Sequence, residues 1–285
     1  MKKKDKTPPL LKFVRWIFPK LERAAPFLAH RYFIRIFFTP LHYKRPEKES
    51  KAERFATPFF FIAAGKKIQG YSWGDAAPYV LLIHGWAGRA TQFRRFIKPL
   101  MNAGFRVIGF DGPAHGRSEG KTTNVVEFEA CLKALYDKFG TPAAIIAHSF
   151  GGTAALFSAM RGLPVRKLIN IASPSIGDEV IKTYLRAING SWKTGEFFKN
   201  YFLITYGKPF DEFSPLHFVK HLPAPVDLLL VHDEDDKEVQ LKHAEALCNV
   251  YPNAMLIRTK GLGHTRILKD DAVIKKIITF VRSSV

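Results

Sequence analysis

The stretch "IIAHSFGG", residues 145–152, contains the end of an apolar run and the start of a glycine-rich segment. The isoleucines and alanine predict a buried strand, and "TAALFSAM" after the glycines predicts a packed helix. Ser149 then lies on a sharp strand-to-helix turn, which requires small residues two positions before and after it. Ala147 and Gly151 meet this requirement. Because such a turn projects the serine hydroxyl away from both elements, Ser149 is a candidate nucleophile.

Outside this stretch, the chain from residue 57 onward alternates helical segments with short apolar strands. This alternation predicts an α/β fold whose mostly parallel sheet is covered by helices on both faces. The first two strands, "FFFIAA" and "KKIQGYSW", predict a hairpin that enters the sheet. Residues 174–225 are too long for an ordinary connection and are rich in Phe, Tyr and Trp at helical spacing. They predict a small helical cap inserted at the sheet edge where ligands bind.

The N-terminal segment carries much of the chain's positive charge. Residues 1–54 contain 15 Lys and Arg against 5 Asp and Glu, whereas the whole chain has a net charge of +19. Basic and aromatic residues alternate there, and no apolar run reaches the roughly 18 residues of a membrane-spanning helix. Two hypotheses explain this basic helical arm: residues 10–43 lie on an anionic membrane surface, or their apolar stripe packs on the domain. We expect no nucleic-acid partner.

The boundary of the domain follows a charged, apolar-poor stretch, "YKRPEKESKAERF", which predicts a linker. We therefore expect an arm and linker over residues 1–56 and a catalytic domain over residues 57–285, with the cap inside it. The two cysteines, Cys131 and Cys248, lie in separate predicted helices and have no zinc-binding spacing. They indicate a reducing compartment, and the predicted location is cytoplasmic.

A nucleophilic serine needs a base, an acid that orients the base, and donors for an oxyanion. In "TKGLGHTRIL", His264 follows a predicted strand and is the candidate base. In "VDLLLVHDEDDKEV", Asp236 is the candidate acid, with Asp233 and Asp235 left as alternatives. Ser149, Asp236 and His264 each follow a strand, so all three are expected at the same edge of the sheet.

Two backbone N–H groups are the expected oxyanion donors: those of Phe150, after the serine, and of Trp86, in the loop "HGWAG". We expect the side chain of His84 to brace that loop. In "DGPAHGRS", Asp111 and His115 are expected to shape the wall of the site. The "HDEDD" run lacks the spacing of a calcium loop, and no GxGxxG follows a strand, so we predict neither a metal nor a dinucleotide.

Taken together, "HGWAG", "DGPAHGRS", "AHSFGG", "HDEDDKEV" and "GLGH" resemble the motifs of the α/β-hydrolase superfamily, specifically its Ser-Asp-His members. The resemblance covers roughly residues 57–285. It implies an eight-stranded, mostly parallel sheet and hydrolysis of esters or related acyl compounds without a metal or organic cofactor.

We therefore expect a serine hydrolase that acts on carboxylic esters or thioesters of small molecules. The aromatic cap favours a substrate with an apolar or aromatic moiety. Hydrolysis of carbon–carbon bonds and acyl transfer could use the same three residues. From another class of function, the chain could be a lipid-surface or nucleic-acid binding module on an inactive hydrolase fold.

Overall fold

The structure is a computed structural model that describes residues 9–283. The chain forms two compact units: a larger one of Pro40–Ser175 with Ser214–Val285, and a smaller one of Met1–Thr39 with Ile176–Phe213. This division differs from the predicted arm and domain. The N-terminal helices group with the inserted helices, and the expected linker belongs to the larger unit.

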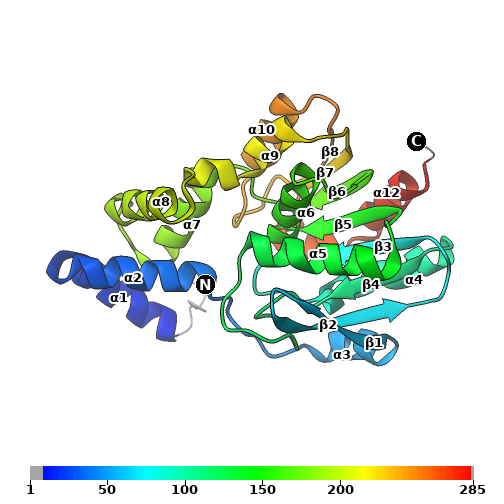
Figure 1. The fold of residues 1–285 in the computed structure, drawn as a ribbon, viewed down its shortest axis with the longest axis horizontal. Helices are drawn as coiled ribbons and strands as arrows, with labels where there is room; N and C mark the ends of the chain where they lie inside the picture. The colour runs from blue at the N-terminus through cyan, green and yellow to red at the C-terminus, as the bar shows by residue number, and fades with distance from the viewer. Residues whose placement is uncertain (1–8, 284–285) are drawn as a thin grey trace. The chain divides into compact units, whose positions relative to one another are not determined.

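An eight-stranded sheet forms the centre of the larger unit (Figure 1). Its strands, in chain order, are β1 (Thr57–Ala63), β2 (Lys66–Trp73), β3 (Tyr79–Ile83), β4 (Arg106–Phe110), β5 (Ala144–His148), β6 (Lys167–Ile171), β7 (Asp227–Asp233) and β8 (Met255–Thr259). Their spatial order is β1-β2-β4-β3-β5-β6-β7-β8. β1 and β2 form the predicted hairpin, β2 also runs antiparallel to β4, and all the other pairs are parallel. The predicted α/β-hydrolase sheet is confirmed.

Helices cover both faces of this sheet. α4 (Arg94–Asn102) and α12 (Asp271–Arg282) contact each other and share one apolar cluster with the strands. α5 (Val125–Phe139) and α6 (Phe150–Met160) pack together on the other face (Figure 1). The unit also contains the α-helices α3 (Glu47–Arg54), α9 (Pro215–Phe218), α10 (Lys242–Val250) and α11 (Gly263–Arg266). All five residues of β3 and of β5 are buried, as expected for central parallel strands.

The segment predicted as a linker is instead the helix α3 (Glu47–Arg54), so that prediction is wrong. Its buried acidic residue is paired: Glu49, 6% exposed, interacts with Arg89 and accepts a hydrogen bond from Thr91. The indole of Trp73 donates to the carbonyl of Ala52 in the same helix. Buried ion pairs thus replace the apolar stripe by which a packed helix is normally recognised.

The described part of the smaller unit contains four α-helices, α1 (Pro9–Ala24), α2 (Pro26–Phe38), α7 (Gly177–Ile188) and α8 (Trp192–Tyr206), and the short 3-10 helix Phe210–Phe213. We call it the four-helix unit. α1 contacts α7, and α2 contacts α8. The apolar cluster at its centre contains Phe18, Ala29, Phe33, Ile181, Leu185, Ile188, Phe198, Phe202 and Phe210. The apolar stripe of the arm therefore packs on the inserted helices.

Polar contacts join the same segments. The Arg15 guanidinium donates to the carbonyl of Ala187 at 2.9 Å. The carboxylate of Glu22 accepts hydrogen bonds from the hydroxyls of Ser191 and Thr194, just before and within α8. Hence both the apolar and the polar contacts of α1 bind it to a segment far away in the sequence. Within residues 9–283, no helix is long and apolar enough to cross a membrane.

Candidate active site

Ser149 lies between β5 and α6, at the strand-to-helix turn expected from the sequence. Its φ angle of 52° is one that a residue with a side chain rarely adopts, and such strain costs about 1–3 kcal/mol. Two hydrogen bonds hold the turn: the Ser149 N–H donates to the carbonyl of Ile171, and the Ser173 hydroxyl donates to the carbonyl of Ser149. Ser149 is half-buried, so part of this residue is exposed to solvent.

The small residues after Ser149 are required by close backbone approaches. A Cβ atom on Gly151 would overlap the carbonyl groups of Ile83 and His84 at the end of β3. A Cβ atom on Gly152 would overlap the side chains of Asn170 and Ser173. Glycines at these positions let α6 begin directly against the neighbouring strands, and this fixes where Ser149 projects.

His264 and Asp236 are joined by a hydrogen bond of 2.7 Å between Nδ1 of the histidine and Oδ2 of the aspartate. Asp236 lies in the loop after β7, and His264 lies in α11, after β8, which is hydrogen-bonded to β7. The other oxygen of Asp236, Oδ1, accepts hydrogen bonds from the N–H groups of Glu238 and Val239. Burial opposes ionisation of Asp236, but the hydrogen bonds from His264 and the backbone outweigh it and lower its pKa.

The two alternative acids have other partners. Asp233 accepts hydrogen bonds from the N–H groups of Leu262 and Gly263, immediately before the histidine. Asp235 accepts one from the N–H of Gly261. Both carboxylates therefore hold the backbone of the loop that carries His264, whereas Asp236 contacts the imidazole itself. This arrangement distinguishes three neighbouring carboxylates that the sequence alone does not.

His148, which precedes Ser149, is a site residue that the sequence reasoning missed. Its ring is 5% exposed, and its Nε2 lies 2.9 Å from the carbonyl oxygen of His264. Burial lowers the pKa of His148 to about 3, so the ring is neutral and its Nε2–H donates to that carbonyl. The two imidazole rings are 4.7 Å apart. His148 thus connects the serine turn to the loop that carries His264. In the sequence, its position directly before Ser149 was the sign that could have pointed to this role.

The loop after β3 lies against the serine turn. A Cβ atom on Gly85 would come within 2.8 Å of the Ser149 Cβ, so only glycine fits there. The rings of Trp86 and Phe150 meet edge to face with centroids 5.3 Å apart. The Gly88 N–H donates to the carbonyl of Gly85 and closes a tight turn around Trp86. The two residues predicted to supply oxyanion donors are therefore neighbours.

His84 braces this loop, as the sequence led us to expect. Its Nε2 accepts a hydrogen bond of 2.7 Å from the Gly112 N–H, and its Nδ1 donates to the carbonyl of Gly85. Burial lowers the pKa of His84 to about 4, which keeps the ring neutral in this arrangement.

Asp111 and His115 also support the loop through its backbone. Asp111 accepts hydrogen bonds from the N–H groups of Ala90 and Arg117, and burial raises its pKa. His115 accepts one at Nε2 from the Ala87 N–H, and burial lowers its pKa to about 3. Both side chains are therefore occupied with backbone contacts, which agrees with the structural role expected for them.

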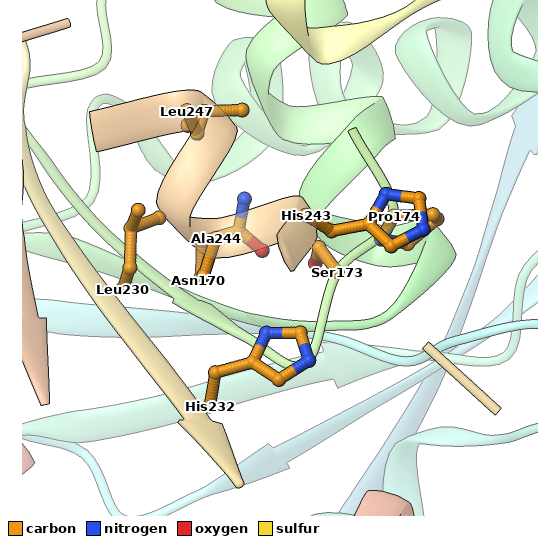
Figure 2. Close-up of a pocket in the computed structure, with 8 residues that line it drawn as sticks. All are labelled: Asn170, Ser173, Pro174, Leu230, His232, His243, Ala244 and Leu247. Atoms are coloured by element: carbon orange, nitrogen blue, oxygen red, sulfur yellow. The ribbon is translucent and has the colours of Figure 1, made fainter. Parts of the chain in front are cut away.

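A cavity of about 10 Å³ lies behind the serine turn (Figure 2). It is lined by Asn170, Ser173, Pro174, Leu230, His232, His243, Ala244 and Leu247. This volume holds about one water molecule and excludes an ester. Its two histidines contact the backbone: His232 is 2.7 Å from the carbonyl of Val239, and His243 accepts a hydrogen bond from the Ser175 N–H. Within residues 9–283, no group of three or more His, Cys, Asp or Glu side chains could hold a metal ion.

This sheet and the loops at its carboxyl edge define an α/β hydrolase. The chain belongs to the alpha/beta hydrolase family, whose model matches residues 80–276. Among known proteins it is similar to human Protein ABHD12B, at 28% identity over 236 residues. That match covers 73% of this chain and 61% of the human protein, so the chain spans less than two thirds of that relative's length.

Two solved structures share the fold. The esterase Pf2001 of Pyrococcus furiosus has a TM-score of 0.64 at 18% identity, with 85% of this chain and 98% of the esterase covered. A bacterial membrane phospholipase A has a TM-score of 0.61 at 16% identity, with 96% of this chain and 99% of that chain covered. At these identities the likeness establishes the shared architecture.

Proposed function

We propose that the protein is a serine hydrolase that cleaves carboxylic esters or thioesters, with Ser149, His264 and Asp236 as its catalytic residues. The observation that carries the proposal is the 2.7 Å hydrogen bond between His264 and a buried, ionised Asp236. Support also comes from the family, and from the esterase and phospholipase among the proteins with the same fold.

In the first step, Nε2 of His264 removes the hydroxyl proton of Ser149 as its Oγ attacks the substrate's carbonyl carbon. Asp236 accepts the hydrogen bond from Nδ1–H, which fixes the tautomer and stabilises the imidazolium that forms. The N–H groups of Trp86 and Phe150 donate to the oxyanion of the tetrahedral intermediate. His148 holds the backbone of His264 and so keeps the imidazole in position.

In the second step, the imidazolium of His264 gives its proton to the leaving alcohol or thiol, and an acyl-enzyme remains on Ser149. A water molecule then attacks the acyl carbon while His264 takes one of its protons. The bond between the acyl carbon and Oγ breaks, the imidazolium of His264 returns the proton to Ser149, and the carboxylic acid is released. Carbon–carbon bond hydrolysis and acyl transfer would use the same residues with a different leaving group or acceptor, so they remain alternative functions.

The predicted preference for an apolar or aromatic substrate loses part of its basis. It rested on the aromatic residues of the cap, and three of these, Phe198, Phe202 and Phe210, are buried in the core of the four-helix unit. The proposal is therefore limited to the ester and thioester class, and the apolar preference remains a prediction.

The test is turnover of a series of para-nitrophenyl esters with acyl chains of increasing length. Ser149→Ala should abolish turnover while the protein stays folded. Ser158→Ala is the matched control, because this serine lies in α6 and its hydroxyl only contacts the carbonyl of Ala154. Wild-type turnover by Ser149→Ala would contradict the proposal, and a rate that rises with chain length would support the apolar preference.

We further propose that the four-helix unit contacts an anionic membrane surface. The outward faces of α1 and α2 carry five exposed large apolar side chains: Phe13, Trp16, Phe27, Leu28 and Tyr32. Exposed basic residues alternate with them: Lys12, Lys20, Arg23, Arg31 and Arg35. The acidic residue of these helices, Glu22, is bonded to Ser191 and Thr194.

Two of these cations lie over exposed aromatic rings, Lys20 over Trp16 and Arg31 over Phe27. A surface of this kind can insert aromatic side chains at the lipid interface while each cation near anionic headgroups adds ~1 kcal/mol. The two cysteines are free thiols, which supports the proposed cytoplasmic location.

A further inference from the structure

A second, larger cavity lies in the larger unit beside the residues that follow Trp86. Its volume is about 200 Å³, and it is lined by Leu41, His42, Tyr43, Arg45, Ala87, Gly88, Arg89, His115, Gly116 and Arg117. Three of these residues are arginines, and none is an Asp or Glu. Guanidinium groups bind carboxylate and phosphate oxygens in a planar, two-bonded geometry.

The arginines are held from behind by carboxylates. Arg45 forms ion pairs with Glu53 and Asp111. Arg117 pairs with the same Glu53 at 2.5 Å. None of these acidic side chains lines the cavity, so they orient the guanidinium groups without occupying the space in front of them.

Arg89 is fixed in a similar way: its Nη2 donates to the carbonyl of Tyr43, and its Nε is 3.5 Å from Glu49. Glu49 is shared with Arg94, at 3.9 Å. The three lining arginines are thus matched by three carboxylates, Glu49, Glu53 and Asp111, and Arg94, which does not line the cavity, brings the formal charge of the whole cluster to +1.

Two histidines, His42 and His115, line the cavity, and the ring of His115 is neutral. Burial first, and then the charges of nearby His84 and Arg89, lower the pKa of His115 to about 3. Its Nε2 accepts the N–H of Ala87, as a neutral ring does. The permanent positive charges in the cavity wall are those of Arg45, Arg89 and Arg117.

The cavity shares a short turn with the candidate active site. Ala87 and Gly88 form part of its wall, and Gly88 donates to the carbonyl of Gly85. Gly85 in turn lies against Ser149. The turn from Gly85 to Gly88 would thus separate an anion in the cavity from Ser149, the proposed nucleophile.

We propose that this cavity is a binding site for an oxyanion group, a phosphate or a carboxylate, held by Arg45, Arg89 and Arg117. The group is either a free anion or the charged end of an ester substrate. Binding of the free anion does not depend on ester hydrolysis, whereas the substrate alternative rests on the function proposed above.

The first arm of the test is calorimetric titration of the full chain with inorganic phosphate at constant ionic strength. Saturable binding is expected, and Arg117→Gln should weaken it about tenfold, the typical effect of losing a charged hydrogen bond. The Arg117 side chain is 62% exposed, and the backbone N–H of residue 117 still donates to Asp111 after the substitution, so this variant should fold. Arg95→Gln, which breaks a surface pair with Asp271, is the matched control and should bind as wild type does.

The second arm compares KM for para-nitrophenyl hydrogen glutarate and for para-nitrophenyl pentanoate, which has the same chain length and no charge. If the anion is part of the substrate, Arg117→Gln raises KM about tenfold for the glutarate only. If the anion is free, only the first arm responds, and Ser149→Ala still binds phosphate. The proposal is overturned if Arg117→Gln behaves as Arg95→Gln does in both arms.

Discussion

The larger unit and the four-helix unit use their side chains in opposite ways. In the larger unit, strands buried on both faces hold a few polar residues at one sheet edge, where hydrogen bonds join Asp236 to His264 and His264 to His148. In the four-helix unit, one face of α1 and α2 is buried against α7 and α8, and the other exposes aromatic and basic side chains. The first arrangement suits chemistry at fixed positions, and the second suits contact with an extended surface.

On this comparison, substitutions of the polar residues at the sheet edge of the larger unit should change turnover and leave lipid binding intact, and substitutions on the exposed face of α1 and α2 should do the reverse. The predictions that follow test this separation.

Asp236→Asn should have the largest effect, a loss of kcat on the order of 10⁴-fold. The amide cannot hold the same tautomer of His264 that the carboxylate holds. Asp235→Asn is the matched control, since its carboxylate contacts only the Gly261 N–H, and it should cost less than about tenfold. Steady-state turnover of a para-nitrophenyl ester measures both. A greater loss in Asp235→Asn or Asp233→Asn would show that the acid is assigned incorrectly.

His148→Ala should reduce kcat by roughly ten- to a hundredfold, because a misplaced imidazole attacks less effectively. The residue acts through the His264 carbonyl, so KM should change little. His148→Gln can restore a donor at a similar position and should recover part of kcat. If both variants lose stability in proportion to activity, and kcat of the folded fraction is unchanged, the positioning role is wrong.

On the four-helix unit, the double variant Trp16→Ala and Phe27→Ala should weaken cosedimentation with phosphatidylserine-containing vesicles about tenfold, because two embedded rings are lost. Phe60→Ala with Ile62→Ala is the control, since both side chains are equally exposed on β1. Binding by wild type should weaken with salt without vanishing, whereas binding to nucleic acid would be lost almost completely.

Turnover of a water-soluble ester should be the same in the wild type and in both of these variants. Full-length protein that stays in the supernatant with anionic vesicles at low salt would contradict the membrane proposal.

The smallest predicted effect is the change of the free energy of unfolding with pH. The pKa values of His84, His115 and His148 are lowered by burial, and the same groups titrate near 6.5 in an unfolded chain. Their contribution to stability is therefore complete above about pH 6.5 and is lost as pH falls toward the folded-state values. As pH falls through this range, each of these histidines should reduce the free energy of unfolding by up to about 1.4 kcal/mol per pH unit.

In urea denaturation between about pH 7 and pH 5, the free energy of unfolding of His148→Gln should depend less steeply on pH than that of the wild type. The difference should correspond to roughly one bound proton. A slope unchanged from wild type would mean that His148 is not buried in its neutral form.

The sequence was most informative about the larger unit, because the residues of the candidate active site lie in short motifs that each follow a strand. Ser149 and His264 could be proposed as nucleophile and base in this way. It did not separate Asp236 from its neighbours, since the choice depends on the path of a loop in space. It missed α3, because Glu49 is buried by pairing with arginine rather than by an apolar stripe. The arm's apolar stripe was visible, but its partners in α7 and α8 were not, since periodicity does not name the surface that a stripe covers.

The central claim, that Ser149 is an activated nucleophile, is tested most directly by labelling with a fluorophosphonate and locating the adduct by mass spectrometry. We predict one adduct per chain, on Ser149, with no labelling of Ser149→Ala and wild-type labelling of Ser158→Ala. Equal labelling of Ser149→Ala, an adduct on another serine, or no labelling of folded wild-type protein would contradict the account.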